Sequence, residues 1–272
     1  MKIALIQMNV TPRKEENLAH AAALAAEAAR GGADIAVLPE MFCCEYRSRA
    51  FVENQEPEDG RVAQTLSRIA KENALYLVGG SFPEAEDGHI YNSSLVFDRQ
   101  GTRIARHRKT HLFDIDVDGG QHFHESDTFT PGSDVTTFDT EFGRMGLCIC
   151  FDIRFPELTR LETLRGAQVL FCPAAFNMTT GPAHWELLFR SRALEDQVFT
   201  AACAPARDEA GSYVSYANSL CCSPWGDVLC RAGAGEELLY AELDLARIDQ
   251  VRRQLPLLSA RRTDVYTLSE GK

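Results

Sequence analysis

The chain has 272 residues, of which 45% are hydrophobic and 25% are charged, and its formal net charge is −11. These proportions are typical of a globular protein with a large buried core, and they exclude a disordered or coiled-coil chain. The acidic balance argues against binding to nucleic acid or to an anionic membrane surface, because both require a basic face. No apolar run approaches the roughly 18 residues that a transmembrane helix needs. The short apolar stretch at the N-terminus resembles a core strand more than a secretory signal.

Strand-like and helix-like segments alternate along the chain. The predicted strands are residues 3–8, 34–38, 75–78, 92–97, 102–107, 135–138, 144–149, 169–172, 198–203, 219–223, 227–231 and 238–243. The predicted helices are residues 17–30, 60–72, 156–165, 183–196 and 246–255. Between Lys109 and Asp134 a polar stretch shows little periodicity and is predicted to be a long functional loop. The mixture of strand types and helices predicts an α/β fold with two sheets face to face and helices outside, as a single domain over residues 1–272.

The nine cysteines are an odd number and include the adjacent pairs 43–44 and 221–222. Adjacent cysteines rarely pair with each other, and a chain of this length does not depend on disulfides. We therefore expect reduced thiols in the cytoplasm, most of them packed in the core.

Cys150 lies between an apolar strand and a helix that starts at Pro156. A nucleophile at such a turn is exposed to substrate, and neighbouring backbone N–H groups can face the reacting atom. A helix N-terminus also favours a thiolate. The local pattern leaves the alternative open that Cys150 is one more buried thiol, as we expect for Cys148 deeper in the same strand.

Two further ionisable residues lie where strands end. Glu40 follows Val-Leu-Pro at the C-terminal end of a predicted buried strand, where the active sites of α/β folds collect. Partial desolvation there would raise its pKa into the range of a general base. Lys109 ends a basic strand at the start of the long loop, from which its ammonium could stabilise an oxyanion. For each residue the alternative is an ordinary solvated charge.

Other chemistries fit the sequence less well. His107, His111, His122 and His124 match neither a zinc nor a calcium spacing, so we expect no metal. The chain has no G-x-S-x-G nucleophile elbow and no glycine-rich nucleotide loop, and we expect no cofactor.

Three segments, residues 38–40 (Leu-Pro-Glu), 108–114 (Arg-Lys-Thr-His-Leu-Phe-Asp) and 150–157 (Cys-Phe-Asp-Ile-Arg-Phe-Pro-Glu), resemble the signatures of the nitrilase (carbon–nitrogen hydrolase) superfamily. Similar segments follow in order at 173–177, 180–186, 190–193 and 223–226, so the resemblance covers nearly the whole chain. It implies a four-layer α-β-β-α sandwich and a homodimer or higher homo-oligomer. Trp185, Phe189 and the tail after Leu255 are the expected interface material.

The resemblance also implies roles. Cys150 would attack the carbon of an amide substrate while Glu40 acts as general base and proton shuttle. Lys109 and the backbone N–H of Phe151 would hold the tetrahedral oxyanion, and Glu125 would orient the lysine and the substrate. Water activated by Glu40 would then hydrolyse the thioester.

Residues 113–117, 123–126 and 175–182 look most like the superfamily members that hydrolyse the terminal amide of 2-oxoglutaramate and 2-oxosuccinamate. The expected substrate contacts are Tyr46, Phe113, Arg154, Phe176 and Thr180. Alternatives are an amidase for deaminated glutathione, another aliphatic amidase, a nitrilase or an N-carbamoyl hydrolase. A catalytically silent binding protein is a further alternative.

Some residues depart from the usual pattern, and they concern the choice of substrate. Cys43 and Glu45 replace the asparagine and proline that usually follow the glutamate, and Asp118-Gly-Gly loosens a loop that borders the pocket. Phe151 stands where tyrosine is usual. A dicarboxylic monoamide requires cations at the site, and we expect Lys109 and Arg154 to supply them.

Overall fold

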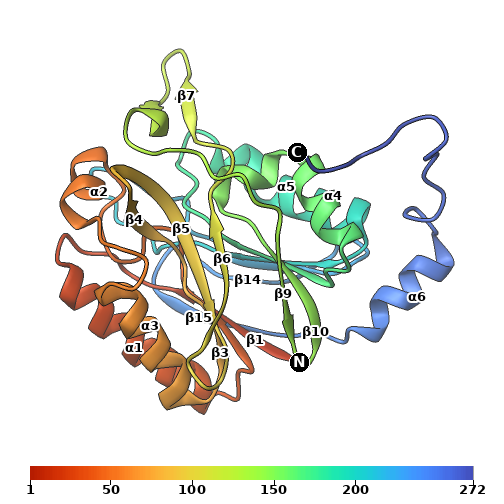
Figure 1. Cartoon of the computed structure of the whole chain (residues 1–272), viewed down its shortest axis with the longest axis horizontal. Coiled ribbons are helices and arrows are strands. Elements are labelled where there is room, and N and C mark those ends of the chain that lie inside the picture. Colours follow the sequence, from red (N-terminus) through yellow and green to blue (C-terminus); the bar gives the residue numbers. More distant parts are fainter. Residues whose placement is uncertain (272) are drawn as a thin grey trace.

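Two β-sheets face each other in the computed structural model, which describes residues 1–271 (Figure 1). One sheet has the order β15-β1-β2-β3-β5-β4, with β6 also pairing with β5. Its strands are β15 (Glu237–Glu242), β1 (Lys2–Gln7), β2 (Ile35–Val37), β3 (Tyr76–Val78), β5 (His89–Phe97), β4 (Phe82–Glu86) and β6 (Arg103–Arg108). The other sheet runs in the order β14 (Val228–Arg231), β13 (Leu220–Cys222), β12 (Phe199–Cys203), β11 (Val169–Pro173), β10 (Gly143–Leu147) and β9 (Thr136–Thr140).

Helices cover the outer face of each sheet. The first sheet packs against α1 (Lys14–Arg30) and α3 (Arg61–Asn73), and the second packs against α4 (Pro156–Leu164) and α5 (Gly181–Asp196). Three buried hydrophobic clusters fill the spaces between the layers, one between the two sheets and one under each pair of helices. The predicted four-layer α-β-β-α sandwich is therefore confirmed.

The sequence explains why α1 covers its sheet. The helix is rich in alanine, and Leu18, Ala21, Ala25 and Ala28 recur at the spacing of one helix face and are buried. Small side chains allow the helix to lie close to β1 and β2, whose residues are almost all buried because these strands have neighbours on both sides. The helix begins three residues earlier than predicted, at Lys14.

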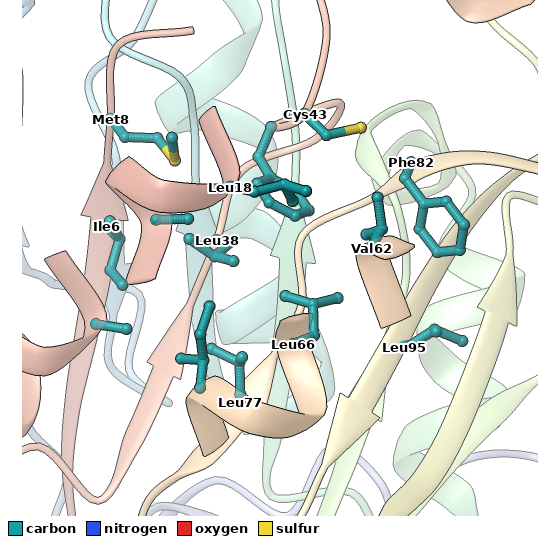
Figure 2. Close-up of a cluster of buried hydrophobic side chains, with 14 of the residues drawn as sticks. Ile6, Met8, Leu18, Leu38, Cys43, Val62, Leu66, Leu77, Phe82 and Leu95 are labelled. Atoms are coloured by element: carbon teal, nitrogen blue, oxygen red, sulfur yellow. The ribbon is translucent and has the colours of Figure 1, made fainter. Parts of the chain in front are cut away.

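The cluster beneath α1 and α3 also anchors the loop that follows β2. Figure 2 shows Leu38 and Cys43 in this cluster with Leu66 of α3 and Leu77 of β3. Because residues on both sides of Glu40 are packed in the core, the position of Glu40 is fixed by the hydrophobic interior.

Some elements were not predicted. The edge strand β4 contains Pro83, which lacks an amide donor and weakens a strand pattern. The hairpin of β7 (Asp114–Asp116) and β8 (His122–His124) lies in the predicted loop 109–134, and its strands of three residues each are too short for a clear strand pattern. Three further short elements were also missed: α2 (Ser48–Asn54), η1 (Glu125–Asp127) and η2 (Cys150–Arg154).

The expectation that Trp185 and Phe189 form an oligomer interface is wrong. Both side chains are fully buried between α5 and the second sheet, where their rings pack edge to face at 4.8 Å. The exposed apolar side chains of this helix are instead Leu187 and Leu194.

The chain ends with α6 (Ala246–Gln254) and a tail without regular structure that returns toward α4 (Figure 1). Glu270 in this tail accepts a hydrogen bond from Arg165 at 2.8 Å. Within residues 1–271 no helix combines the length and the apolar character needed to cross a membrane.

Candidate active site

Four of the predicted residues meet where the two sheets end. Glu40 follows β2 and Lys109 follows β6 in the first sheet, while Cys150 follows β10 in the second and begins η2. Glu125 comes from η1 in the long loop. The structure therefore brings together side chains from both sheets and from the loop, and all four are buried.

Lys109 lies between two carboxylates. Its Nζ is 2.9 Å from Glu40 Oε1 and 2.8 Å from Glu125 Oε2. Burial disfavours the ammonium, but the charges of Glu125 and Glu40 outweigh it and hold the pKa of Lys109 well above its ordinary value. The lysine is therefore a permanent cation, and it is already neutralised by its neighbours. That Lys109 supplies a cation for a substrate carboxylate stays a prediction, which its two carboxylate neighbours disfavour.

Glu40 is a buried carboxylate whose two oxygens have different surroundings. Asn92 Nδ2 and the Lys109 ammonium donate to its Oε1, both at 2.9 Å. Burial raises its pKa, Lys109 opposes the rise, and Glu125 adds to it, so the pKa of Glu40 lies above its usual 4.5. Within residues 1–271 its Oε2 accepts no hydrogen bond from nitrogen or oxygen, and the Cys150 thiol is among the neighbours that lower the pKa.

Cys150 occupies a strained position. Its φ is +48°, in the left-handed region that residues other than glycine rarely adopt. Burial and the charge of Glu40 raise the pKa of the thiol well above its usual value, although Lys109 and a hydrogen bond from the Ala175 backbone lower it. The resting group is thus a thiol, and the carboxylate of Glu40 is its neighbour.

Asp152 holds the turn that carries Cys150, and sequence reasoning assigned it no role. It accepts hydrogen bonds from His107 Nε2 at 2.9 Å, from His111 Nδ1 at 2.8 Å and from the amide of Ile149 at 3.0 Å. Burial alone would raise its pKa, but the two histidines hold it below the ordinary range. Its place two residues after the nucleophile was the only signal in the sequence.

The same contacts explain the histidines of the loop. His107 and His111 bind Asp152, whereas His122 and His124 bind Asp116 on the β7–β8 hairpin at 3.0 and 2.8 Å. The four histidines thus divide between two places. Within residues 1–271 no three metal-ligating side chains come together as they would around an ion.

A narrow, largely enclosed space lies against Cys150, and we name it the inner cavity. Its lining consists of Phe113, Cys150, Phe151, Arg154, Ala175, Phe176 and Thr180. Four of the five predicted substrate contacts therefore share one cavity with the nucleophile. Tyr46 lies outside it, and its hydroxyl donates to Glu125 Oε1 at 3.0 Å.

Arg154 enters the inner cavity without a carboxylate partner. Its guanidinium carbon lies 4.8 Å from the centre of the Phe176 ring and 5.4 Å from that of Phe151, and its Nη1 is 3.1 Å from His184 Nδ1. No carboxylate within residues 1–271 forms an ion pair with it, and its buried Nε has no partner there. Burial lowers the pKa of Arg154. The cavity can therefore offer an unneutralised cation to an anionic ligand.

Asn92 is a further residue that sequence reasoning left as an ordinary strand residue. From β5 its Nδ2 donates to Glu40 Oε1 at 2.9 Å and to Glu125 Oε1 at 3.2 Å. It therefore fixes the positions of the two carboxylates relative to each other. Nothing in the strand pattern around it distinguishes it from its neighbours.

Buried Glu, Lys and Cys at the end of an α-β-β-α sandwich define a class of enzyme that cleaves carbon–nitrogen bonds. A sequence model of the carbon-nitrogen hydrolase family matches residues 2–253, and the chain belongs to that family. It is an amidohydrolase.

Relatives of known activity or known structure show which members of the family this chain is similar to. The chain is 46% identical to omega-amidase NIT2 of Mus musculus over 271 residues, which cover 100% of this chain and 98% of the relative. The crystal structure of Saccharomyces cerevisiae Nit3, a member of branch 10 of the nitrilase superfamily, matches with a TM-score of 0.89 and 39% identity over 96% of both chains. A mutant amidase from Nesterenkonia sp. AN1 matches with a TM-score of 0.79 and 25% identity over 97% of this chain and 95% of its own. It carries the acetamide moiety of fluoroacetamide on its active-site cysteine.

Proposed function

We propose that the enzyme is an omega-amidase, which hydrolyses the terminal amide of 2-oxoglutaramate or 2-oxosuccinamate to the 2-oxo diacid and ammonia. The observation that carries this proposal is Arg154, an unpaired cation in the cavity of Cys150. A substrate that bears a carboxylate at the end opposite its amide would place the amide at Cys150 and the carboxylate at Arg154. The similarity to omega-amidases over the whole chain supports the same substrate class.

The narrow lining of the inner cavity favours a small substrate. The side chains around Cys150 enclose little free space, which suits a short acyclic diacid monoamide better than a bulky one. Deaminated glutathione is about twice as large and would require a wider pocket, since ligand sites enclose most of the ligand surface. The aromatic rings of Phe113 and Phe176 would flank the carbon chain, and Thr180 would assist Arg154 in binding the carboxylate.

Acylation begins with the thiol proton. Glu40 takes it as Cys150 Sγ attacks the amide carbon, and the carbonyl oxygen becomes an oxyanion. Lys109 has three N–H donors, and with two carboxylates bound, one remains for the oxyanion beside the backbone N–H of Phe151. As the C–N bond breaks, protonated Glu40 gives its proton to the leaving nitrogen, and ammonia departs.

Deacylation reverses the roles of the same groups. Glu40, again a carboxylate, removes a proton from water, whose oxygen attacks the thioester carbon. The second tetrahedral oxyanion uses the same donors. Its collapse breaks the C–S bond, and the proton on Glu40 returns to the sulfur of Cys150. Glu125 holds Lys109 throughout, because Nζ donates to its Oε1 at 3.0 Å and lies 2.8 Å from its Oε2.

The test is ammonia release from a panel of amides that contains 2-oxoglutaramate, 2-oxosuccinamate, deaminated glutathione, an aliphatic nitrile and an N-carbamoyl amino acid. We expect the first two to be hydrolysed with the highest kcat/KM. Cys150→Ala should abolish turnover, and Cys148→Ala, which changes a buried thiol two residues away, should retain it. Higher kcat/KM for deaminated glutathione would contradict the substrate, and full activity in Cys150→Ala would contradict the mechanism.

We also propose that the whole chain acts as one catalytic domain in the cytoplasm. Eight of its nine cysteines are buried free thiols and the ninth is partly buried, which suits a reducing compartment. In this proposal two copies associate through α5, where Leu187 and Leu194 are 66% and 45% exposed and two turns apart on one face. Analytical ultracentrifugation of Leu187→Asp should show loss of the dimer, whereas a monomeric wild type would contradict the association.

A further inference from the structure

A second cavity lies on the other side of the catalytic centre. This outer cavity has a volume of about 60 Å³ and is lined by Val10, Glu40, Met41, Cys44, Glu45, Tyr46, Pro205, Ala206, Asp208, Gly211, Ser212, Tyr213 and Ser215. Glu40 borders the outer cavity and Cys150 borders the inner one. The base and the nucleophile are therefore neighbours that face different spaces.

Tyr213 forms part of the wall between the two spaces. Its ring borders the outer cavity and lies 4.6 Å from the ring of Tyr46, while its hydroxyl donates to the carbonyl of Ala175, which borders the inner cavity. Burial raises the pKa of Tyr213 well above its usual value, so the hydroxyl remains a donor at neutral pH. Tyr46 is held in turn by its bond to Glu125. Two tyrosine rings in tilted contact therefore lie beside Glu40 in the lining of the outer cavity.

The chemistry of the two linings tells which end of the substrate faces which space. This step depends on the proposed function. The acyl part carries the carboxylate and belongs with Arg154 in the inner cavity. The leaving nitrogen receives its proton from Glu40, so it must lie on the side of the outer cavity. The described lining of that cavity includes the carboxylates of Glu45 and Asp208 and no cationic side chain, which suits an amine better than an acid.

We propose that Tyr213 is a specificity-determining residue that restricts the enzyme to unsubstituted amides by closing the leaving-group side of the catalytic centre. An amide that carries an N-alkyl group would need space where the Tyr213 ring now lies. Without that ring the two cavities join, and the outer one provides room for a small alkylamine. The ligand class assigned to the outer cavity is therefore a short primary amine.

The reaction of such an amide is balanced by the same groups. Cys150 forms the C–S bond, the C–N bond to the alkylated nitrogen breaks, and Glu40 transfers to that nitrogen the proton it took from the thiol. The alkylamine leaves through the outer cavity. Water then hydrolyses the thioester as before, and no further reactant is consumed.

The experiment compares 2-oxoglutaramate with its N-ethyl amide in wild type, Tyr213→Ala and Tyr213→Phe. The measured quantity is the ratio of kcat/KM for the N-ethyl amide to that for the unsubstituted amide. We expect Tyr213→Ala to raise this ratio by about tenfold or more, in line with the effect of making room for a small apolar group. Tyr213→Phe keeps the ring and loses only the bond to Ala175, so its ratio should stay within about threefold of wild type.

An unchanged ratio in an active Tyr213→Ala enzyme would overturn the proposal. A ratio in Tyr213→Phe as high as in Tyr213→Ala would also overturn it, because the ring would then not be the barrier. If Tyr213→Ala does not fold, Tyr213→Leu offers a smaller loss of volume and should raise the ratio in the same direction. Failure of the proposed function has a separate signature, in which wild type does not hydrolyse unsubstituted 2-oxoglutaramate. The ratio is then measured on whichever primary amide it does hydrolyse.

Discussion

Lys109 and Arg154 are two cations that border the same nucleophile, the first fully and the second partly buried, and they differ in their partners. Lys109 contacts two carboxylates at 2.8 to 2.9 Å, and its pKa is held high. Arg154 has aromatic rings and a histidine as neighbours, and burial lowers its pKa. One cation is neutralised before any substrate arrives, and the other is neutralised only when an anion binds.

The difference teaches how charge is divided within the site of an acidic protein. A cation that takes part in bond making has to be held rigidly, and two carboxylates hold Lys109. A cation that recognises substrate has to lack a carboxylate partner. Such a cation is uncommon in a protein whose formal net charge is −11. Removing Lys109 should therefore lower both stability and kcat. Removing Arg154 should mainly raise KM.

The largest effect is expected for Lys109→Met. The variant removes an oxyanion donor and leaves Glu40 and Glu125 buried without their shared partner. We expect kcat to fall by about 10³ or more and the free energy of unfolding to fall by about 3–5 kcal/mol. Steady-state kinetics and urea unfolding measure the two quantities, with the exposed Lys71→Met as the control. Wild-type stability in Lys109→Met would show that the two carboxylates do not depend on it.

Arg154→Met should change binding and leave stability intact. We expect KM for 2-oxoglutaramate to rise by about 10- to 100-fold with little change in kcat, because an ionic hydrogen bond to the substrate is lost. The free energy of unfolding should stay the same or rise, since a buried cation without a carboxylate partner is removed. A fall in unfolding free energy as large as that of Lys109→Met would erase the distinction between the two cations.

Asp152→Asn tests the support beneath the nucleophile. The substitution keeps the shape and removes the charge that accepts from His107 and His111, so we expect a loss of about 1–3 kcal/mol of stability and a fall in kcat of about tenfold. The pKa of Asp152 is depressed in the folded state. Its contribution is thus present above the ordinary carboxyl pKa and lost as the pH falls below it. Unfolding curves of wild type and variant should converge in acid, and a constant difference would contradict this assignment.

The smallest predicted effect is a shift in a pH profile. Glu40 must be a carboxylate to accept the thiol proton, and burial raises its pKa above 4.5. Activity should therefore decline with falling pH through a midpoint above 4.5 in the plot of kcat/KM. The rate at which iodoacetamide alkylates Cys150 should decline over the same pH range. A midpoint at or below pH 4.5 would show that Glu40 is not the base.

The sequence predicted the layered fold because its core strands and α1 carry the periodicities of their structure. It failed at β4, where Pro83 interrupts the pattern, and at β7–β8, where each strand has only three residues and hydrogen bonds from two histidines to Asp116 join the hairpin. Local hydrophobic patterns contain no record of such pairings. The same reason explains why the interior position of Trp185 was missed, since helix amphipathicity does not tell an interface from a core.

The sequence predicted those site residues that stand at the ends of strands. It did not predict the residues that support the site by hydrogen bonds to other side chains or to the backbone. Glu40, Lys109 and Cys150 stand at strand ends, and the resemblance to a family gave them roles. Asn92 and Asp152 work through contacts with residues 52 and 45 positions away, and Tyr213 through one with Ala175. Such contacts exist only in the folded chain. The free charge on Arg154 likewise became visible only when its surroundings were known.

The most direct test of the account is the mass of the enzyme during turnover of 2-oxoglutaramate. Acid quenching followed by intact-mass and peptide analysis should reveal a 2-oxoglutaryl thioester on the peptide that contains Cys150, and the adduct should be absent from Cys150→Ala. An adduct on another residue, or steady ammonia release from 2-oxoglutaramate by Cys150→Ala, would contradict the account.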